Sequence, residues 1–166
     1  MTKRLATTIL AAMILVAGGT SLVRAQDNEN ARITLKGITA VGVQIAPLPD
    51  AARIPGLTRE IIQADVELKV RAAGIRIVTM EESHKLLGDP NLLVSVSGLE
   101  DAQLAHIKVE LHQNAVLQRN KQLLPGVVTW SEGITGEKQS SQDIRDMVED
   151  MIDVFLNAWL SVNPKK

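Results

Sequence analysis

Histidine is the side chain here best suited to bind a metal or move a proton near neutral pH, and two of the three histidines follow one expected strand. His106 and His112 are six residues apart, which places both on the same face of that strand. At about 3.3 Å per residue they lie roughly 20 Å from each other, whereas a zinc ion holds its nitrogen ligands at about 2 Å. We therefore expect no metal site and no cofactor.

The patterns that activate a nucleophile are also missing. The chain has no cysteine, no Gly-x-Ser-x-Gly elbow and no His-Glu-x-x-His motif. His84 follows Glu81 and Glu82 on an expected short helix, where such a histidine is usually a charged surface residue.

Glu100, Asp101 and Glu110 could form a pair of carboxylates if a hairpin brings them together. Glycoside hydrolysis would also need a cleft that binds sugar, and nothing in the sequence predicts one. We expect a protein that is not an enzyme and has no catalytic residues. An unrecognised hydrolase, with a site assembled from distant loops, is an alternative.

The residues from 106 to 112 alternate between apolar and polar types. Ile107, Val109 and Leu111 form the apolar set. This pattern is typical of a strand with one buried face and one solvated face. The solvated face is a candidate interaction surface, made of His106, Lys108, Glu110 and His112.

A second candidate interaction surface lies near the C-terminus. Apolar residues between 144 and 160 recur at helical spacing, and the apolar arc widens toward the end of the run. Either the sheet covers this end more deeply, or Leu156, Trp159 and Leu160 contact a partner. Trp130 is expected on the core side of its strand together with Val128.

Residues 1–25 have the three parts of a secretory signal peptide. Lys3 and Arg4 precede an apolar run of about ten residues, which is shorter than the roughly 18 that a membrane span needs. Small residues before position 26 favour cleavage after Ala25. We expect a periplasmic or secreted protein with no stable membrane anchor, and a single domain over residues 26–166.

Composition restricts the partners of that domain. Removing residues 1–25 takes away Lys3, Arg4 and Arg24 and no acidic residue, which leaves a net charge of −4. A mildly acidic domain has no electrostatic footprint for nucleic acid and gives no reason to dock on anionic lipid. Two tryptophans and one phenylalanine make an aromatic stacking platform improbable.

The order of the expected elements gives the fold class. Strands are expected at 38–45, 75–80, 92–97, 106–112 and 127–131, with a loose lead-in at 26–31 and loops at 100–103 and 133–141. Thr58 and Gly74 delimit one long helix, a short helix covers 81–87, and Ser140 caps a final helix. We predict an α+β two-layer sandwich, with a mixed sheet of about five strands and two main helices on one face, in the order β-α-β-α-β-β-β-α.

Two segments resemble a pattern found in uncharacterised exported bacterial proteins. They are residues 56–75 and the Thr129-Trp130-Ser131 strand with the loop and helix that follow it. The element order is also similar to small periplasmic modules, such as the N-terminal domain of the Tol translocation protein and the lipopolysaccharide-assembly lipoprotein. Those proteins bind partners, but the chain lacks the cysteine that a lipoprotein anchor needs.

Together these observations favour a non-enzymatic binding or assembly module outside the cytoplasm. Its partner would be another envelope protein or a second copy of the chain. A structural homodimer, formed through the solvated face, an exposed edge strand or the Trp159 end, is a further alternative. The sequence does not identify the partner.

Overall fold

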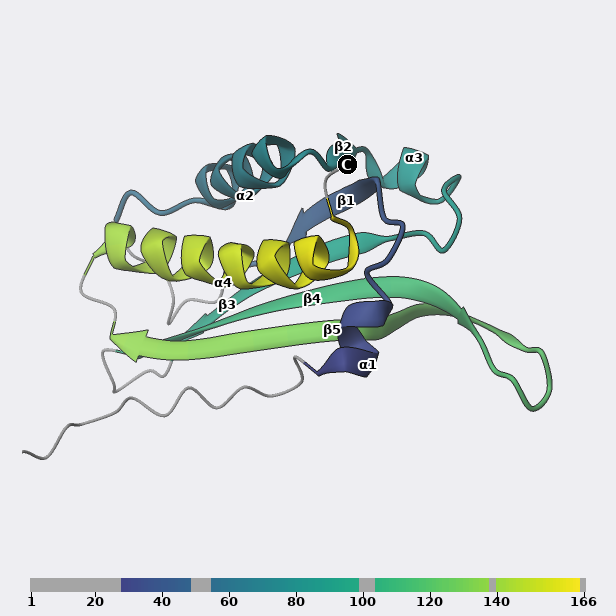
Figure 1. Ribbon diagram of the computed structural model, residues 1–166. Helices are drawn as coiled ribbons and strands as arrows, with labels where there is room; N and C mark the ends of the chain where they lie inside the picture. Colours follow the sequence, from purple (N-terminus) through teal and green to yellow (C-terminus); the bar gives the residue numbers. More distant parts are fainter. Residues whose placement is uncertain (1–27, 49–54, 99–103, 138–139, 165–166) are drawn as a thin grey trace, which may run out of the picture.

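The computed structural model describes residues 28–48, 55–98, 104–137 and 140–164. The expected signal peptide at 1–25 and the expected hairpin loop at 100–103 lie outside these ranges, and so do Glu100 and Asp101. Within them the chain forms one open mixed sheet and four helices, which confirms the predicted α+β class (Figure 1).

The sheet has the strand order β2-β1-β3-β4-β5. Strand β1 pairs in parallel with both β2 and β3, because a helical crossover precedes each of them, whereas β3, β4 and β5 are antiparallel neighbours. The strands span Ala40–Ile45 (β1), Arg76–Val78 (β2), Asn91–Gly98 (β3), Leu104–Val116 (β4) and Leu123–Glu137 (β5).

The caps that the sequence predicts delimit the two long helices. In α2 (Arg59–Ala73) the Thr58 hydroxyl accepts from the Ile61 amide, and Gly74 ends the helix with a φ of 101°. In α4 (Ser141–Val162) Ser140 and Asp143 form a capping box. The short helices are α1 (Glu29–Ile33) and α3 (Met80–Ser83).

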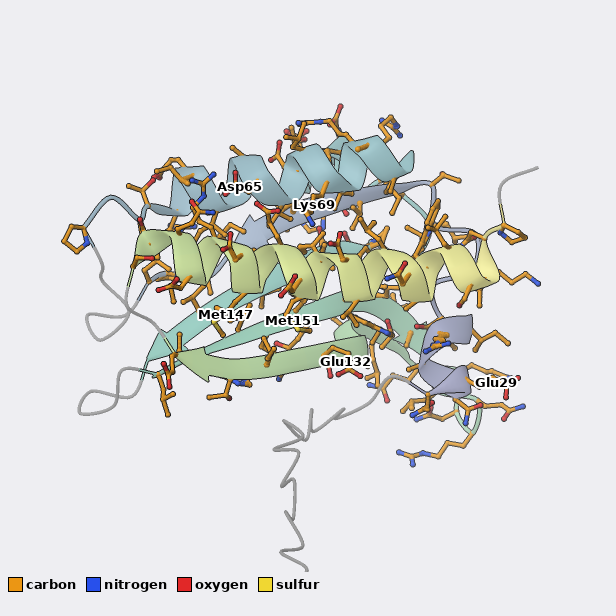
Figure 2. All side chains as sticks on the ribbon, turned by 60° about the vertical axis from the view of Figure 1, so that its left-hand side comes forward. Glu29, Asp65, Lys69, Glu132, Met147 and Met151 are labelled. Carbon is orange, nitrogen blue, oxygen red and sulfur yellow. The ribbon has the colours of Figure 1, made fainter. Side chains whose placement is uncertain are left out.

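Helices α2 and α4 lie side by side on one face of the sheet (Figure 1). Arg145 of α4 donates two hydrogen bonds to the Asp65 carboxylate of α2, at 2.7 and 3.0 Å. Lys69 of α2 lies 2.7 Å from the Asp153 carboxylate of α4, and Figure 2 shows Asp65 and Lys69 on the side of α2 next to α4. The core therefore fills the space between this helical layer and a single face of the sheet.

Two predictions of local structure need correction. The expected lead-in contains helix α1, which is capped by the Asn28 side chain. The expected loop at 133–141 is strand as far as Glu137. Gly133 and Gly136 lack side chains because other side chains occupy that space: a Cβ would lie 3.0 Å from the His106 ring at Gly133, and 3.1 Å from the Met147 methyl at Gly136.

Strands β4 and β5 continue past the start of β3 as a two-stranded hairpin, which we call the arm (residues 112–128, Figure 1). The register shifts at two places, and each time β5 carries the extra residue. Leu111 pairs with Trp130 but His112 pairs with Val128, so Thr129 is a bulge. Val128 thus leaves the core side and is exposed, contrary to the prediction, while Trp130 is fully buried as expected.

Candidate functional site

The strongest candidate site is the face of β3, β4 and β5 opposite α2 and α4, which we call the open face. On β4 the helix-covered residues Ile107, Val109 and Leu111 are fully buried. Between them Lys108 and Glu110 point the other way, as the alternation predicted. Their cross-strand neighbours on β3 are Ser95 and Leu93, both half-buried. The solvated face that was predicted for this strand is therefore present in the structure.

Lys108 and Glu110 form an ion pair at the centre of the open face. The Lys108 ammonium lies 2.7 Å from the Glu110 carboxylate, and the two side chains are 44% and 15% exposed. Glu110 pairs across the strands with Ser131, which is buried. The centre of the open face is thus a mixed-charge surface, in which Lys108 and Glu110 are paired with each other.

The two histidines of β4 lie at opposite ends of this face. His106 is exposed, and its Nδ1 lies 3.0 Å from the Thr135 hydroxyl. His112 is half-buried, with Nδ1 3.2 Å from the Gly126 carbonyl and Nε2 buried. Within the described residues no group of three or more His, Asp or Glu side chains could hold a metal ion.

A hydrogen-bonded cluster that the sequence analysis missed borders the open face. This polar corner consists of Ser83, His84, Asp89 and Asn91, and it lies where α3 packs over Gly42 of β1. The Asp89 carboxylate accepts from Ser83 at 3.0 Å and from Asn91 at 2.8 Å. It also lies 2.8 Å from His84 Nδ1. The cluster joins the α3 segment to the first residue of β3.

Asp89 is the centre of the polar corner. Burial alone would raise the pKa of its carboxyl group, but hydrogen bonds from His84, Asn91 and Ser83 outweigh it and lower the pKa below that of an ordinary aspartate. The single hydrogen of the Ser83 hydroxyl is shared between Asp89 and the Pro90 carbonyl, each 3.0 Å away, so this hydroxyl is held within the cluster. The arrangement orients His84 through its contact with Asp89.

The second expected interaction surface needs correction. Leu156 and Trp159 belong to the core, because the sheet and the segment before β1 cover the end of α4. The Trp159 indole donates to the Ile38 carbonyl at 2.9 Å. Leu160 is half-buried and packs against the same core. The wider apolar arc is therefore explained by deeper burial, and these residues do not form an exposed patch.

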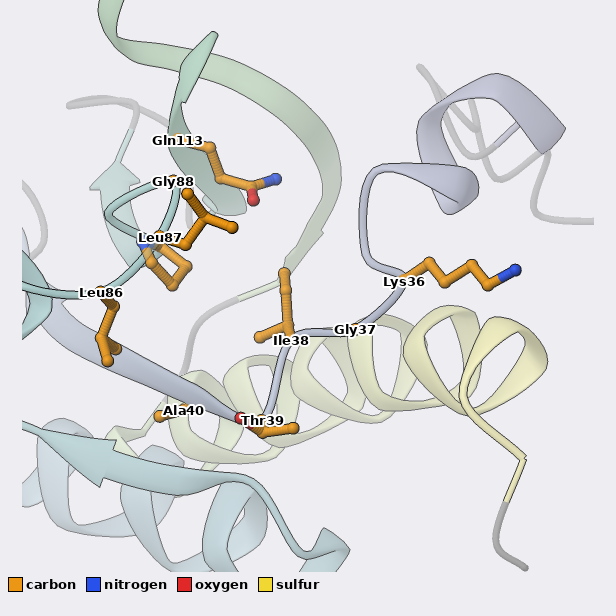
Figure 3. Close-up of a pocket in the computed structure, with 10 residues that line it drawn as sticks. Lys36, Gly37, Ile38, Thr39, Ala40, Leu86, Leu87, Gly88 and Gln113 are labelled. Carbon is orange, nitrogen blue, oxygen red and sulfur yellow. The ribbon is translucent and has the colours of Figure 1, made fainter.

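A cavity of about 460 Å³ opens at the end of the sheet from which the arm projects (Figure 3). Ile38, Leu86 and Pro90 give it a mainly apolar wall, and Gln113 adds an amide. Lys36 is the one charged residue among those that line it. The hydrolase alternative requires titratable groups that converge on a cavity. This cavity provides a single one, whereas a second cavity of about 440 Å³ is lined by Glu137, Asp143 and Asp146.

Comparisons with known proteins leave the family open. No protein-family model matches the chain, and no curated protein matches it. Among solved structures, the chain is similar to the PelC dodecamer from Paraburkholderia phytofirmans, with 19% identity over 72% of this chain and 87% of that one, at a TM-score of 0.40. A single-residue variant of the same protein, also a dodecamer, matches with 21% identity over 75% and 89% of the two chains, at a TM-score of 0.40.

No helix among the described residues is long and apolar enough to span a membrane.

Proposed function

We propose that this protein is a non-enzymatic module that binds another polypeptide outside the cytoplasm through the open face. One observation carries this proposal: the sheet packs α2 and α4 on one side, and no described helix covers β4 and β5 on the other. The signal-peptide pattern of residues 1–25 supports the location. Another envelope protein and a second copy of the chain are both candidate partners.

The chemistry of the open face favours a polar, mixed-charge partner surface. Lys108 and Glu110 are paired with each other, so the partner has no isolated buried charge to neutralise. The pleated surface of β3, β4 and β5 between Ser95 and Thr135 offers contact area to a polypeptide. Charges at such a surface contribute more to specificity and association rate than to affinity.

Site-specific photo-crosslinking in living cells tests the proposal. A photoreactive residue at Lys108 should yield a discrete crosslinked species, because this position faces the partner. The same residue at Gln142, which is exposed on α4, is the matched control and should yield none. Equal crosslinking at both positions, or none at either, contradicts the proposal.

The proposed location has its own test. Mass spectrometry of the protein recovered from the cell envelope should show a chain that begins at Gln26. A full-length chain that begins at Met1, found with the cytoplasmic fraction, contradicts export.

A further inference from the structure

The arm carries a concentration of exposed apolar side chains. Val116 and Leu123 pair with each other across its two strands and are 59% and 58% exposed. Val128 is also exposed, and so is Leu87, whose neighbour Gly88 accepts a hydrogen bond from the Asn114 amide of the arm. These four residues are most of the seven large apolar side chains that are exposed in the described chain.

The three exposed apolar residues of the arm, Val116, Leu123 and Val128, share one face. Both register shifts add residues to β5, so β4 keeps its regular alternation from Lys108 through His112 to Val116. Val128 pairs directly with His112, and Leu123 pairs directly with Val116. The apolar stripe of the arm is therefore an extension of the open face beyond the sheet.

Charge is segregated in the same region. The chain has 19 acidic residues, yet none lies between Glu110 and Glu132. Arg119 and Lys121 are exposed at the tip of the arm, and neither has an ion-pair partner within the described residues. The arm is thus cationic and apolar, on a domain that is otherwise acidic.

From this arrangement we infer that the arm docks on an anionic phospholipid surface. Apolar side chains enter the boundary between headgroups and acyl chains, and the long Arg119 and Lys121 side chains reach the headgroup phosphates. The acidic remainder of the domain is repelled by the same surface, so that contact is confined to the arm. The binding is peripheral and reversible, and it differs from the expectation based on net charge, because net charge averages over the arm and the rest of the domain.

A lipid surface fits the arm better than a protein groove does. Protein interfaces concentrate their binding energy in aromatic and arginine anchors, and leucine and valine are under-represented among these anchors. The arm has no phenylalanine, tyrosine or tryptophan and a single arginine, Arg119, and its exposed apolar residues are valines and a leucine. The inference is independent of the proposed function, because it concerns the arm rather than the centre of the open face.

Co-sedimentation with vesicles tests this inference. The chain from Gln26 onward keeps every described element and removes the apolar run of residues 1–25, which would itself bind lipid. It should bind vesicles of phosphatidylcholine mixed with phosphatidylglycerol and should bind weakly to phosphatidylcholine alone. The double variant Arg119→Gln/Lys121→Gln should lower the partition coefficient about tenfold, and high salt should abolish this difference.

Matched apolar variants test whether lipid binding depends on the arm or on any exposed apolar side chain. Val116→Ser/Leu123→Ser should also lower the partition coefficient about tenfold. Leu68→Ser should leave it unchanged, because Leu68 is 68% exposed but lies on α2. Circular dichroism checks that each variant is folded. Failure of the unaltered protein to bind anionic vesicles overturns the inference, as does equal binding by the arm variants. A loss of self-association in those variants, without any lipid binding, assigns the arm to a second copy and also overturns it.

Discussion

The two faces of the sheet are built from the same strands but differ in what lies on them. Toward α2 and α4, β4 presents Ile107, Val109 and Leu111, all fully buried. Toward the other side it presents a paired lysine and glutamate, flanked by histidines. Because side chains alternate along a strand, one segment supplies the core with its odd-numbered residues and the proposed contact surface with its even-numbered ones. Stability and the proposed binding can therefore be altered separately.

Truncation on the helix-covered face should have the largest effect. Ile107 is fully buried, so Ile107→Ala leaves a cavity beneath α4 and should lower the free energy of unfolding by about 2–5 kcal/mol. Urea denaturation followed by circular dichroism measures the loss. A change below about 1 kcal/mol would show that the helical layer does not pack on this strand as described.

On the side of the sheet opposite α2 and α4, helix α3 covers part of strand β1. A substitution beneath α3 should therefore change stability, unlike one on the open face. Gly42 lies under α3, and a Cβ there would meet the Asn91 amide oxygen, with the Met80 sulfur at 3.2 Å. Gly42→Ala should therefore cost about 1–3 kcal/mol of unfolding free energy through overpacking. Gln44→Ala is the matched control, because Gln44 is exposed on the same side of the same strand, and it should cost little. Equal unfolding midpoints for the two variants would contradict the packing of α3.

Substitution of the N-terminal cap of α4 tests how much the stability of the protein depends on the end of this helix. The Ser140 hydroxyl accepts from the Asp143 amide at 3.2 Å, so Ser140→Ala should cost about 1 kcal/mol. Thermal denaturation measures this effect, and Ser140→Asp, which can also cap, is the matched control. The same loss of about 1 kcal/mol in Ser140→Ala and in Ser140→Asp would show that Ser140 stabilises the protein by something other than capping α4.

The polar corner should make part of the stability depend on pH. The folded-state pKa of Asp89 is lowered, so its carboxylate stabilises the fold above the ordinary aspartate pKa of about 3.9, and this contribution is lost as pH falls below that value through the lowered pKa. Asp89→Asn should be less stable than the unaltered chain at neutral pH, and the difference should shrink in acid. A constant difference in urea midpoint from pH 7 to pH 3 would contradict this role.

Substitution at the centre of the open face should have the smallest effect on stability. Lys108→Ala removes a partly exposed ion pair, which is worth about 0–1 kcal/mol. Unfolding in urea should be nearly unchanged, whereas crosslinking from neighbouring positions of the open face in cells should fall. Severe destabilisation would place Lys108 in the structural core rather than at a contact surface.

Local signals predicted the parts of the fold that depend on local chemistry. Thr58, Gly74 and Ser140 delimit helices through hydrogen bonds and backbone angles within a few residues, so their sequence neighbourhood was sufficient. The alternation from 106 to 112 likewise predicted which side chains form the candidate site. Both predictions rest on the period of a single element.

The features that sequence patterns missed depend on distant contacts. The bulge at Thr129 is held by hydrogen bonds to the Leu111 carbonyl and from the Gln113 amide, and these displace Val128. The buried Trp159 indole donates a hydrogen bond to the carbonyl of Ile38, which is 121 positions away in the sequence. The polar corner needs Asp89 at a φ of 47°, where the turn brings its carboxylate to His84. The spacing of apolar and polar residues along the sequence does not predict such long-range contacts.

Because the natural chain has no cysteine, alkylation of single cysteine variants tests the central claim most directly. In the dilute purified protein, Lys108→Cys should react quickly and Val109→Cys only on unfolding. In cells, the Lys108→Cys thiol should become protected by the proposed partner; if that partner is a second copy, concentrated purified protein should protect it too. Rapid reaction of this thiol in cells and in the purified protein at every concentration would contradict the account.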